Sequence, residues 1–537
     1  MDNIICTFDK AQYLTGADIR IQLPPHISVL QLRLFQLARC IDCPVQRKGD
    51  ELVLRGLPEG NYGVLIETPS GGWEGAFDIV SDQRKITRYG FLADFSLTDG
   101  GIDDVAWMRD LHLNAVQFYD WMYRHDSLLP DSDCYQDPLG RDLNLSVIRK
   151  KAEACKAFGM RPFAYGAIYA ATHETFQKHP EWGMYTMDGK PLMFAGWLHF
   201  MNIAAGCGWT DHLLRQYQDV ISFGFSGIHM DTYGFPKLTW DVSRRPVELS
   251  GEFAGLIDRA SSSVCAVDKN AGVIFNAVNN WPVEAVAGAA QDAIYIEVWP
   301  PNDTYYDLYK LIRDAKRCAD KPVILAAYIK PFQFPDTPAA ERALRLAWAA
   351  ISASGGTHLV FGEGNGALQD SYYVNYAHLR REFAPVAQKY CDFLVRYADL
   401  MYNDIGSDIS KTASSGINED VCFAHEQYSF TPDGAENTVW TILRESSVRL
   451  TIHLINLVGN SAAWNEGKNT PREVNDIRIR LRLDRPVQGI YCASPDSVSL
   501  CAQALPFSYE ITEQGRVYSF RLSGLQYWKA VWVEWEK

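Results

Sequence analysis

The chain has 537 residues, 47% of them hydrophobic and 22% charged, which is typical of a folded protein with more than one domain. Its 51 basic and 65 acidic residues give a net charge of −14, which argues against nucleic acid or an anionic membrane as the main partner. The sequence contains no run of about 20 apolar residues, so it predicts no membrane span. A neutral ligand such as a sugar is compatible with these features.

Residues 1–85 contain short apolar runs separated by turn signals, which predict a small antiparallel β-sandwich of immunoglobulin-like type. The first residues lack the basic region and apolar stretch of a secretory signal. We therefore expect a cytoplasmic protein, or a secreted one if a signal peptide has been removed. The 12 cysteines are scattered, as in reduced proteins. Only Cys40 and Cys43 form a close pair, and no second pair follows at zinc-ligand spacing.

Residues 86–400 carry eight short apolar runs, each followed by an amphipathic stretch. Near-continuous apolar runs that alternate with helices indicate buried parallel strands. Eight such units predict a (β/α)8 TIM barrel. The predicted strands are Gly90–Phe95, Ala115–Asp120, Arg161–Tyr169, Gly227–Gly234, Gly272–Val278, Ala293–Pro300, Pro322–Ile329 and Thr357–Gly362.

Polar and aromatic residues gather at the carboxyl ends of these predicted strands, which is where barrel enzymes carry their chemistry. A charged group at the end of a buried run is costly unless it is paired or used, so a ring of such groups indicates a site. The candidate site residues, in chain order, are Asp120, Trp121, Tyr165, His229, Asp231, Asn276, Glu297, Trp299, Tyr328 and Glu363.

The residue types in this ring favour carboxylate chemistry. The sequence has no closely spaced histidine pair and no phosphate-binding loop, so we expect neither a metal nor a cofactor. Carboxylates combined with aromatic platforms fit a glycosidase, which needs one carboxylate as nucleophile or base and one carboxylic acid as proton donor. Asp231 and Glu297 are the best pair, because each interrupts a strongly apolar run at its end. Position alone leaves open a strand-end cap for Asp231 and an ion-pair partner for Glu297.

Residues 401–537 are predicted to form a second antiparallel β-sandwich. Ile477, Ile479 and Leu481 alternate with arginines, which indicates a strand with one buried and one solvated face. The sequence therefore predicts a multidomain α/β protein in which two β-sandwich domains, at 1–85 and 401–537, flank a barrel at 86–400.

Several strand segments resemble those of glycoside hydrolase family 66, which contains dextranases and cycloisomaltooligosaccharide glucanotransferases. They occur in the same order, at Arg88–Phe95, Val116–Trp121, Gly227–Gly234, Phe275–Asn280 and Ile294–Pro300. The resemblance implies a retaining hydrolase of α-1,6 linkages in dextran or isomaltooligosaccharides. It also implies that Asp231 is the nucleophile and Glu297 the general acid/base.

We expect the other candidate site residues to bind the substrate. The alternative for each is that it only packs at the rim of the barrel. Hydrogen bonds to the sugar are expected from Asp120, Tyr165, Asn276 and Glu363, and stacking walls from Trp121, Trp299 and Tyr328. His229 lies two residues before Asp231 and so points to the same side of the strand. It either lines the floor of the pocket or is a core histidine with satisfied hydrogen bonds.

The family's cyclising members are expected to carry a carbohydrate-binding module inserted late in the catalytic region. Here the eighth strand is followed by a closing helix and then the C-terminal β domain, which favours a hydrolytic, dextranase-like endo-α-1,6-glucanase. A glucanotransferase using the same two carboxylates is the nearest alternative. A second alternative is a glucan-binding protein without catalytic activity. The presence of both carboxylates argues against it, because binding alone does not require such a pair. The sequence does not indicate an oligomeric state.

Overall fold

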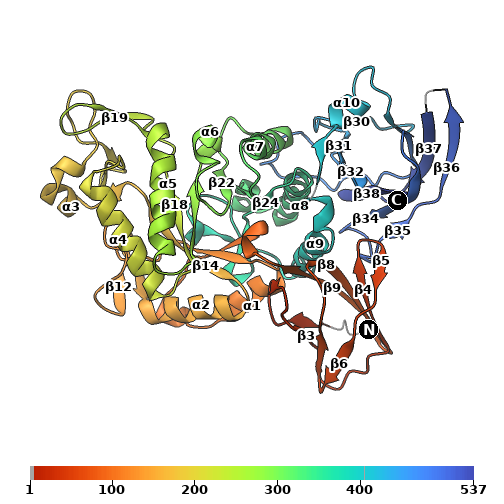
Figure 1. Cartoon of the computed structure of the whole chain (residues 1–537), viewed down its shortest axis with the longest axis horizontal. Coiled ribbons are helices and arrows are strands. Elements are labelled where there is room, and N and C mark those ends of the chain that lie inside the picture. Colours follow the sequence, from red (N-terminus) through yellow and green to blue (C-terminus); the bar gives the residue numbers. More distant parts are fainter. Residues whose placement is uncertain (1–4, 404, 514, 537) are drawn as a thin grey trace.

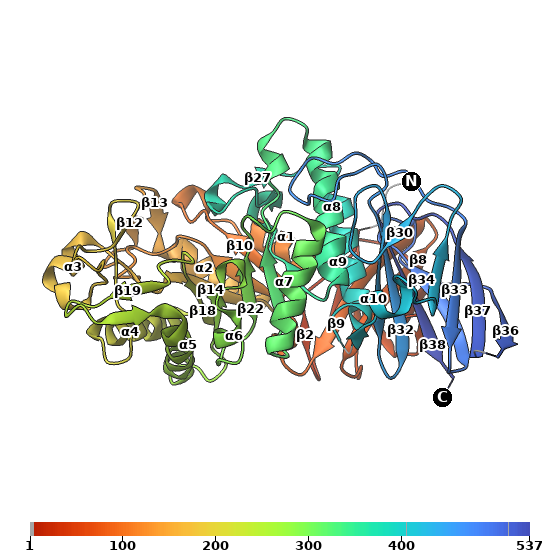
Figure 2. The same cartoon turned by 90° about the horizontal axis from the view of Figure 1, so that it is seen from above.

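The computed structural model describes residues 5–403, 405–513 and 515–536. The chain forms an elongated molecule in which a central barrel is joined to two β domains (Figures 1 and 2). The N-terminal sheets, red in Figure 1, lie against both the barrel and the C-terminal sheets. Among the described residues, no helix is long and apolar enough to cross a bilayer.

The barrel strands run parallel, each paired with its neighbours in chain order. Their side chains are almost entirely buried, which explains why they read as continuous apolar runs. The strands are β10 (Tyr89–Leu92), β11 (Ala115–Phe118), β14 (Arg161–Ala167), β18 (Gly227–Asp231), β21 (Gly272–Asn276), β22 (Ile294–Glu297), β23 (Val323–Ala326), β24 (Thr357–His358) and β25 (Phe361–Gly362).

The eighth predicted strand is split in two, and the split closes the barrel. Its first part, β24, pairs with β23, and its second part, β25, pairs with β10 at the other end of the ladder. Only Leu359 and Val360 separate the two parts. One segment therefore joins both ends of the sheet, and the predicted TIM barrel is confirmed.

Helices follow the strands around the barrel, and several have the ends that their sequence predicts. Asn144 caps α2 by accepting hydrogen bonds from two backbone amides, and Gly159 ends that helix with a φ of 75°. The helices are α1 (Asp103–Asp110), α2 (Leu145–Ala157), α4 (Gly208–Phe223), α5 (Leu249–Cys265), α6 (Val283–Val286), α7 (Tyr305–Cys318), α8 (Thr337–Ala353) and α9 (Ala384–Arg396).

Two long loops extend the barrel at the carboxyl ends of its third and fourth strands. The loop after β14 contains β15 (Ala170–Ala171), α3 (His173–Lys178), β16 (Met193–Phe194) and β17 (Leu198–Phe200). The loop after β18 contains the hairpin of β19 (Leu238–Trp240) and β20 (Pro246–Glu248). Both project from the barrel on the side away from the C-terminal domain (Figures 1 and 2).

The N-terminal domain consists of two sheets that share a buried cluster including Ile19, Leu54, Tyr62 and Phe77. Pairing is antiparallel except between β2 and β9. The first sheet contains β1 (Thr7–Phe8), β3 (Ile19–Gln22), β7 (Glu51–Leu54) and β6 (Val45–Lys48). The second contains β2 (Tyr13–Leu14), β9 (Gly71–Val80), β8 (Gly60–Thr68), β4 (Gln31–Gln36) and β5 (Arg39–Ile41).

The C-terminal domain also has two sheets around a shared core. Ile477, Ile479 and Leu481 are buried there while Arg478 and Arg480 are exposed, as the alternation predicts. The larger sheet contains β28 (Ser407–Asp408), β30 (Phe430–Thr431), β31 (Val439–Glu445), β32 (Arg449–Asn456), β38 (Trp528–Trp535), β34 (Val487–Ala493) and β35 (Gln503–Ala504). The smaller contains β29 (Val421–Ala424), β33 (Ile477–Leu483), β37 (Gly515–Leu522) and β36 (Phe507–Thr512).

Candidate active site

Three neighbouring strands bring Asp231, Asn276 and Glu297 together at the carboxyl end of the barrel. They are the last residues of β18, β21 and β22. The Asn276 amide donates a hydrogen bond to Asp231 Oδ1 at 2.8 Å and another to Glu297 Oε2 at 3.1 Å. The amide therefore lies between the two carboxylates and holds both in fixed positions.

The shared amide limits the distance between the two carboxylates. The two oxygens that it contacts cannot be farther apart than the sum of 2.8 and 3.1 Å. Nearest oxygens this close are compatible with the distance of about 5–5.5 Å between the carboxyl groups of retaining glycosidases, which is shorter than the roughly 6.5–9.5 Å of inverting ones.

Each carboxylate also accepts a hydrogen bond from a tyrosine. The Tyr165 hydroxyl donates to Asp231 Oδ2 at 2.8 Å, and the Tyr328 hydroxyl donates to Glu297 Oε1 at 2.8 Å. Burial raises the pKa of both carboxyl groups, and the charge of Glu297 raises the pKa of Asp231 further. The donated hydrogen bonds oppose this rise because they stabilise the ionised forms. The pair therefore favours a state with one proton shared between its members.

Stacked rings form the floor beneath the carboxylates. His229 is 1% exposed, lies against Tyr165 and Tyr89, and shares a 3.3 Å hydrogen bond with the Tyr89 hydroxyl. Burial lowers the pKa of His229 to about 3, so its imidazole is neutral. Of the two interpretations that the sequence left open, the structure combines both: His229 lines the pocket and is buried within the floor.

The carboxylates line a pocket of about 580 Å³ whose walls come from strand ends and from loops, including the two long ones. The sequence did not predict the aromatic residues of the long loops as wall residues, because no pattern links an irregular loop to a distant strand end. Trp197 and Phe235 keep 37% and 49% of their surface exposed, which leaves ring surface free for a ligand. The additional aromatic wall residues are Tyr119, Phe194, Trp197, Tyr233, Phe235, Tyr295, Tyr372 and Tyr373.

Asp120, Tyr328 and Trp299, which the sequence proposed, also line this pocket. Asp120 has a φ of 46°, so the chain turns sharply there as it leaves β11. Burial raises the pKa of Asp120 to about 7, an effect that Arg141 partly opposes. Trp299 is 40% exposed and meets the Tyr328 ring edge-on at 6.2 Å. These residues therefore face the same cavity as the two carboxylates.

Trp121 is not a wall of this pocket, which corrects the expectation from the sequence. Its side chain is fully buried and packs against Phe225, with a ring separation of 4.7 Å. Its indole nitrogen donates to the backbone oxygen of Tyr165 at 3.1 Å. The turn at Asp120 directs the Trp121 ring behind the strands, where it supports the barrel instead of the ligand.

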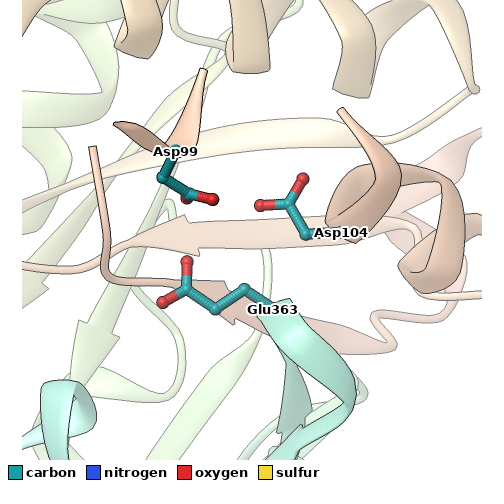
Figure 3. A group of neighbouring side chains, drawn as sticks. All are labelled: Asp99, Asp104 and Glu363. Carbon is teal, nitrogen blue, oxygen red and sulfur yellow. The ribbon is translucent and has the colours of Figure 1, made fainter. Parts of the chain in front are cut away.

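Glu363 also lies outside this pocket, because β25 ends before it and the chain turns. Its carboxylate accepts hydrogen bonds from the backbone amides of Ala93 and Asp94, at the end of the first strand. Figure 3 shows it converging with Asp99 and Asp104, and their oxygens lie within 4.8 Å of one another. The buried Lys151 ammonium donates to both aspartates and offsets part of this negative charge. Glu363 therefore ties the closing strand to the first one.

Comparisons with known proteins give this arrangement a context. A cycloisomaltooligosaccharide glucanotransferase of Niallia circulans is 24% identical over 634 aligned positions, covering 88% of this chain and 64% of that protein. A dextranase of Streptococcus salivarius is 22% identical over 58% of this chain and 44% of its own length. The chain thus spans less than two thirds of the length of these curated relatives.

Solved structures show the same fold. A Paenibacillus sp. cycloisomaltooligosaccharide glucanotransferase complexed with cycloisomaltoheptaose superposes with a TM-score of 0.88 and 21% identity, over 98% of this chain and 99% of that one. An α-amylase of Geobacillus thermoleovorans complexed with acarbose gives a TM-score of 0.52 and 10% identity, over 85% of this chain and 99% of that one. The sequence pattern of glycosyl hydrolase family 66 matches residues 71–532. That match covers the end of the N-terminal domain, the whole barrel and nearly all of the C-terminal domain, so the chain belongs to glycosyl hydrolase family 66.

Proposed function

We propose that this protein is a retaining glycoside hydrolase that cleaves α-1,6-glucosidic linkages in dextran or isomaltooligosaccharides. The observation that carries the proposal is the Asp231 and Glu297 pair, held at short range by Asn276 in a pocket with aromatic walls. Family membership and the names of the relatives support the choice of an α-1,6-linked glucan.

In this proposal Asp231 is the nucleophile and Glu297 the general acid and base. Asp231 attacks the anomeric carbon while Glu297 gives its proton to the departing glycosidic oxygen. The resulting glucosyl ester on Asp231 has inverted configuration. Glu297, now ionised, then takes a proton from water, which attacks the same carbon and restores the α configuration. The Tyr165 and Asn276 donors stabilise the Asp231 carboxylate when it is released.

Transfer to a sugar hydroxyl instead of water is the second candidate, because the Niallia and Paenibacillus relatives are named glucanotransferases. We favour hydrolysis because residues 363–400 leave no room for the inserted carbohydrate-binding module that we expect in the family's cyclising members. The alignment with the Niallia protein runs over 634 positions although this chain has 537 residues, so that relative carries insertions that are missing here. Between β25 and the C-terminal domain, this chain has only residues 363–400, which hold two short strands and α9.

The test is chromatography of the products formed from dextran, isomaltooligosaccharides and soluble starch. We expect linear isomaltooligosaccharides from the α-1,6-linked substrates and no products from starch. Asp231→Ala should abolish product formation, because removing a nucleophile from such a pair costs about 10⁴-fold or more in rate. Cyclic products would assign the protein to the transferases, and inactivity on every α-1,6 substrate would refute the proposed specificity.

A matched control separates loss of the nucleophile from loss of the fold. Asp211→Ala removes an exposed carboxylate from the first turn of α4, and Asp211 is not among the residues that line the pocket. It should keep wild-type activity. Binding of isomaltooligosaccharides by Asp231→Ala, measured by calorimetry, would show that this variant retains a folded pocket. A variant that binds but retains full activity would exclude Asp231 as the nucleophile.

A further inference from the structure

A second pocket, of about 680 Å³, lies between the barrel and the C-terminal domain. One wall is a face of α7, and the other comes from β28, β31 and α10 (Ser410–Ser414). In Figure 1, α10 and β31 lie on the side of α7 that faces the C-terminal domain. None of its lining residues belongs to the pocket that contains Asp231 and Glu297. The charged side chains of its lining are Arg313, Lys316, Arg317, Asp320, Asp408, Lys411 and Arg444.

The lining is basic although the chain as a whole carries a charge of −14. The five cationic side chains of the lining outnumber its two carboxylates, although Arg313 and Arg317 also pair with Asp314 outside the lining. Asp408 uses its oxygens to accept hydrogen bonds from Ser410 and from the Tyr309 hydroxyl. Asp320 forms no ion pair within 4.0 Å in the part of the chain that the structure describes.

Two cations of this pocket form no ion pair within 4.0 Å with a described residue, although Asp408 lies opposite Arg444 and Asp320 lies near Lys316. Arg444 is only 7% exposed; it donates one hydrogen bond to the Ser354 carbonyl at 2.9 Å, and its Nε has no partner among the described residues. Lys316, from the facing side of α7, forms no hydrogen bond or ion pair with any described residue. Burial and the nearby charge of Arg444 lower the pKa of Lys316. Two like charges near each other in a recessed site are costly without an anion to balance them.

We propose that this pocket binds a phosphoryl group, as inorganic phosphate or as a phosphate ester. A guanidinium and an ammonium that face one cavity provide charge-assisted hydrogen bonds to an oxyanion. Lys411 adds a third cation, whose ammonium lies 4.9 Å from the Tyr306 ring centre. Tyr306 and Tyr309 stack on each other at 5.2 Å along the same wall and provide a surface for the organic part of an ester.

Calorimetric titration of the full chain tests this proposal, with inorganic phosphate and glucose 6-phosphate as separate probes and sodium chloride at matched ionic strength as the reference. We expect saturable binding of at least one phosphoryl probe and no saturable heat from chloride. Tighter binding of the ester would identify an esterified ligand, and equal binding would identify phosphate itself. Absence of saturable binding of both probes would overturn the proposal.

Two lysine substitutions on α7 test whether the phosphoryl group binds in this pocket. Lys316→Met should weaken binding about tenfold or more, since a charge-assisted hydrogen bond contributes about 1.5–3 kcal/mol. Lys310→Met is the matched control, because Lys310 lies on α7, pairs with Asp307 and does not line the pocket. It changes the net charge equally and should bind phosphate as the wild type does. Unchanged binding in Lys316→Met, or an equal loss in Lys310→Met, would contradict the assignment.

Discussion

At the scale of single residues, the site depends on how protons are distributed between two carboxylates that one amide holds together. Among the described residues, only Asn276 donates hydrogen bonds to both, so its position sets their spacing. The tyrosines act on one carboxylate each, since Tyr165 donates to Asp231 and Tyr328 to Glu297. Changing one tyrosine at a time therefore alters the direct hydrogen bond of one carboxylate and leaves that of the other in place.

Tyr165→Phe removes a hydrogen bond that stabilises the ionised form of Asp231, so the pKa of Asp231 should rise. If Asp231 must be ionised to attack, the acidic limb of the kcat/KM profile should move to higher pH. The rate at the optimum should fall roughly 10–100-fold, as expected for the loss of a hydrogen bond to a charged group. An unchanged acidic limb would show that Asp231 does not set it.

Tyr328→Phe removes the corresponding hydrogen bond from Glu297, so the pKa of Glu297 should rise. Glu297 would then keep its proton to higher pH, and the alkaline limb of the kcat/KM profile should move upward. Because the two variants lose the same chemical group on opposite sides of the pair, each is a control for the other. A shift of the same limb in both variants would contradict the assignment of acid and nucleophile.

At the scale of elements, the sequence predicted the strands well because each barrel strand is buried on both faces and therefore has a continuous apolar pattern. The same pattern located Asp231 and Glu297, since a carboxylate at the end of such a run interrupts it. It did not locate the residues just beyond a strand. Trp121 follows a turn with positive φ at Asp120, and Glu363 follows the last residue of β25, so the two-residue alternation no longer applies.

The wall residues were missed for another reason. Trp197 and Phe235 lie in long irregular loops, where neither periodicity nor spacing indicates which aromatic rings face the barrel. Their position depends on the tertiary packing of the loop, such as the stacking of Phe194 on Tyr233 at 4.2 Å. Information of this kind is distributed over contacts between distant segments, and a single sequence does not display it.

The cluster that closes the barrel gives a prediction at this scale. Lys151, on α2, donates to Asp99 and Asp104, which lie beside Glu363. Lys151→Met would leave these carboxylates without their cation and should lower the free energy of unfolding by about 3 kcal/mol. Lys150→Met, which removes the neighbouring exposed lysine, should have little effect. Denaturant unfolding measures both, and equal stability of the two variants would refute the role of Lys151.

At the scale of the whole molecule, the C-terminal domain contacts two loops of the barrel. One loop follows β22, which ends at Glu297, and the other follows β23 and contains Tyr328. Trp464 donates from its indole nitrogen to the Asn302 carbonyl at 2.7 Å, in the loop after β22. Asn465 accepts from the Lys330 amide at 2.8 Å, in the turn after β23. The buried Lys468 ammonium donates to Ser461 and to the Ala463 carbonyl, which holds the contacting segment together.

Lys468→Met should therefore impair catalysis from a distance. Without the ammonium, the segment loses internal hydrogen bonds and the loops that follow Glu297 and Tyr328 lose their support. We expect kcat to fall about tenfold, because small displacements of catalytic groups are costly, with a smaller change in KM. Lys529→Met removes another buried lysine of the same domain, one that donates to Ser523 away from the barrel, and is the matched control. Equal kcat values would show that the contact is not coupled to the site.

The central claim, a double-displacement reaction at an α-linked glucan, is tested most directly by the configuration of the first product. Proton NMR during hydrolysis of an isomaltooligosaccharide distinguishes the α and β anomers before they interconvert. The spacing set by Asn276 predicts that the α anomer forms first and that the β anomer appears only later, by mutarotation. Initial formation of the β anomer would contradict a covalent intermediate on Asp231, and with it the assignment of the two carboxylates.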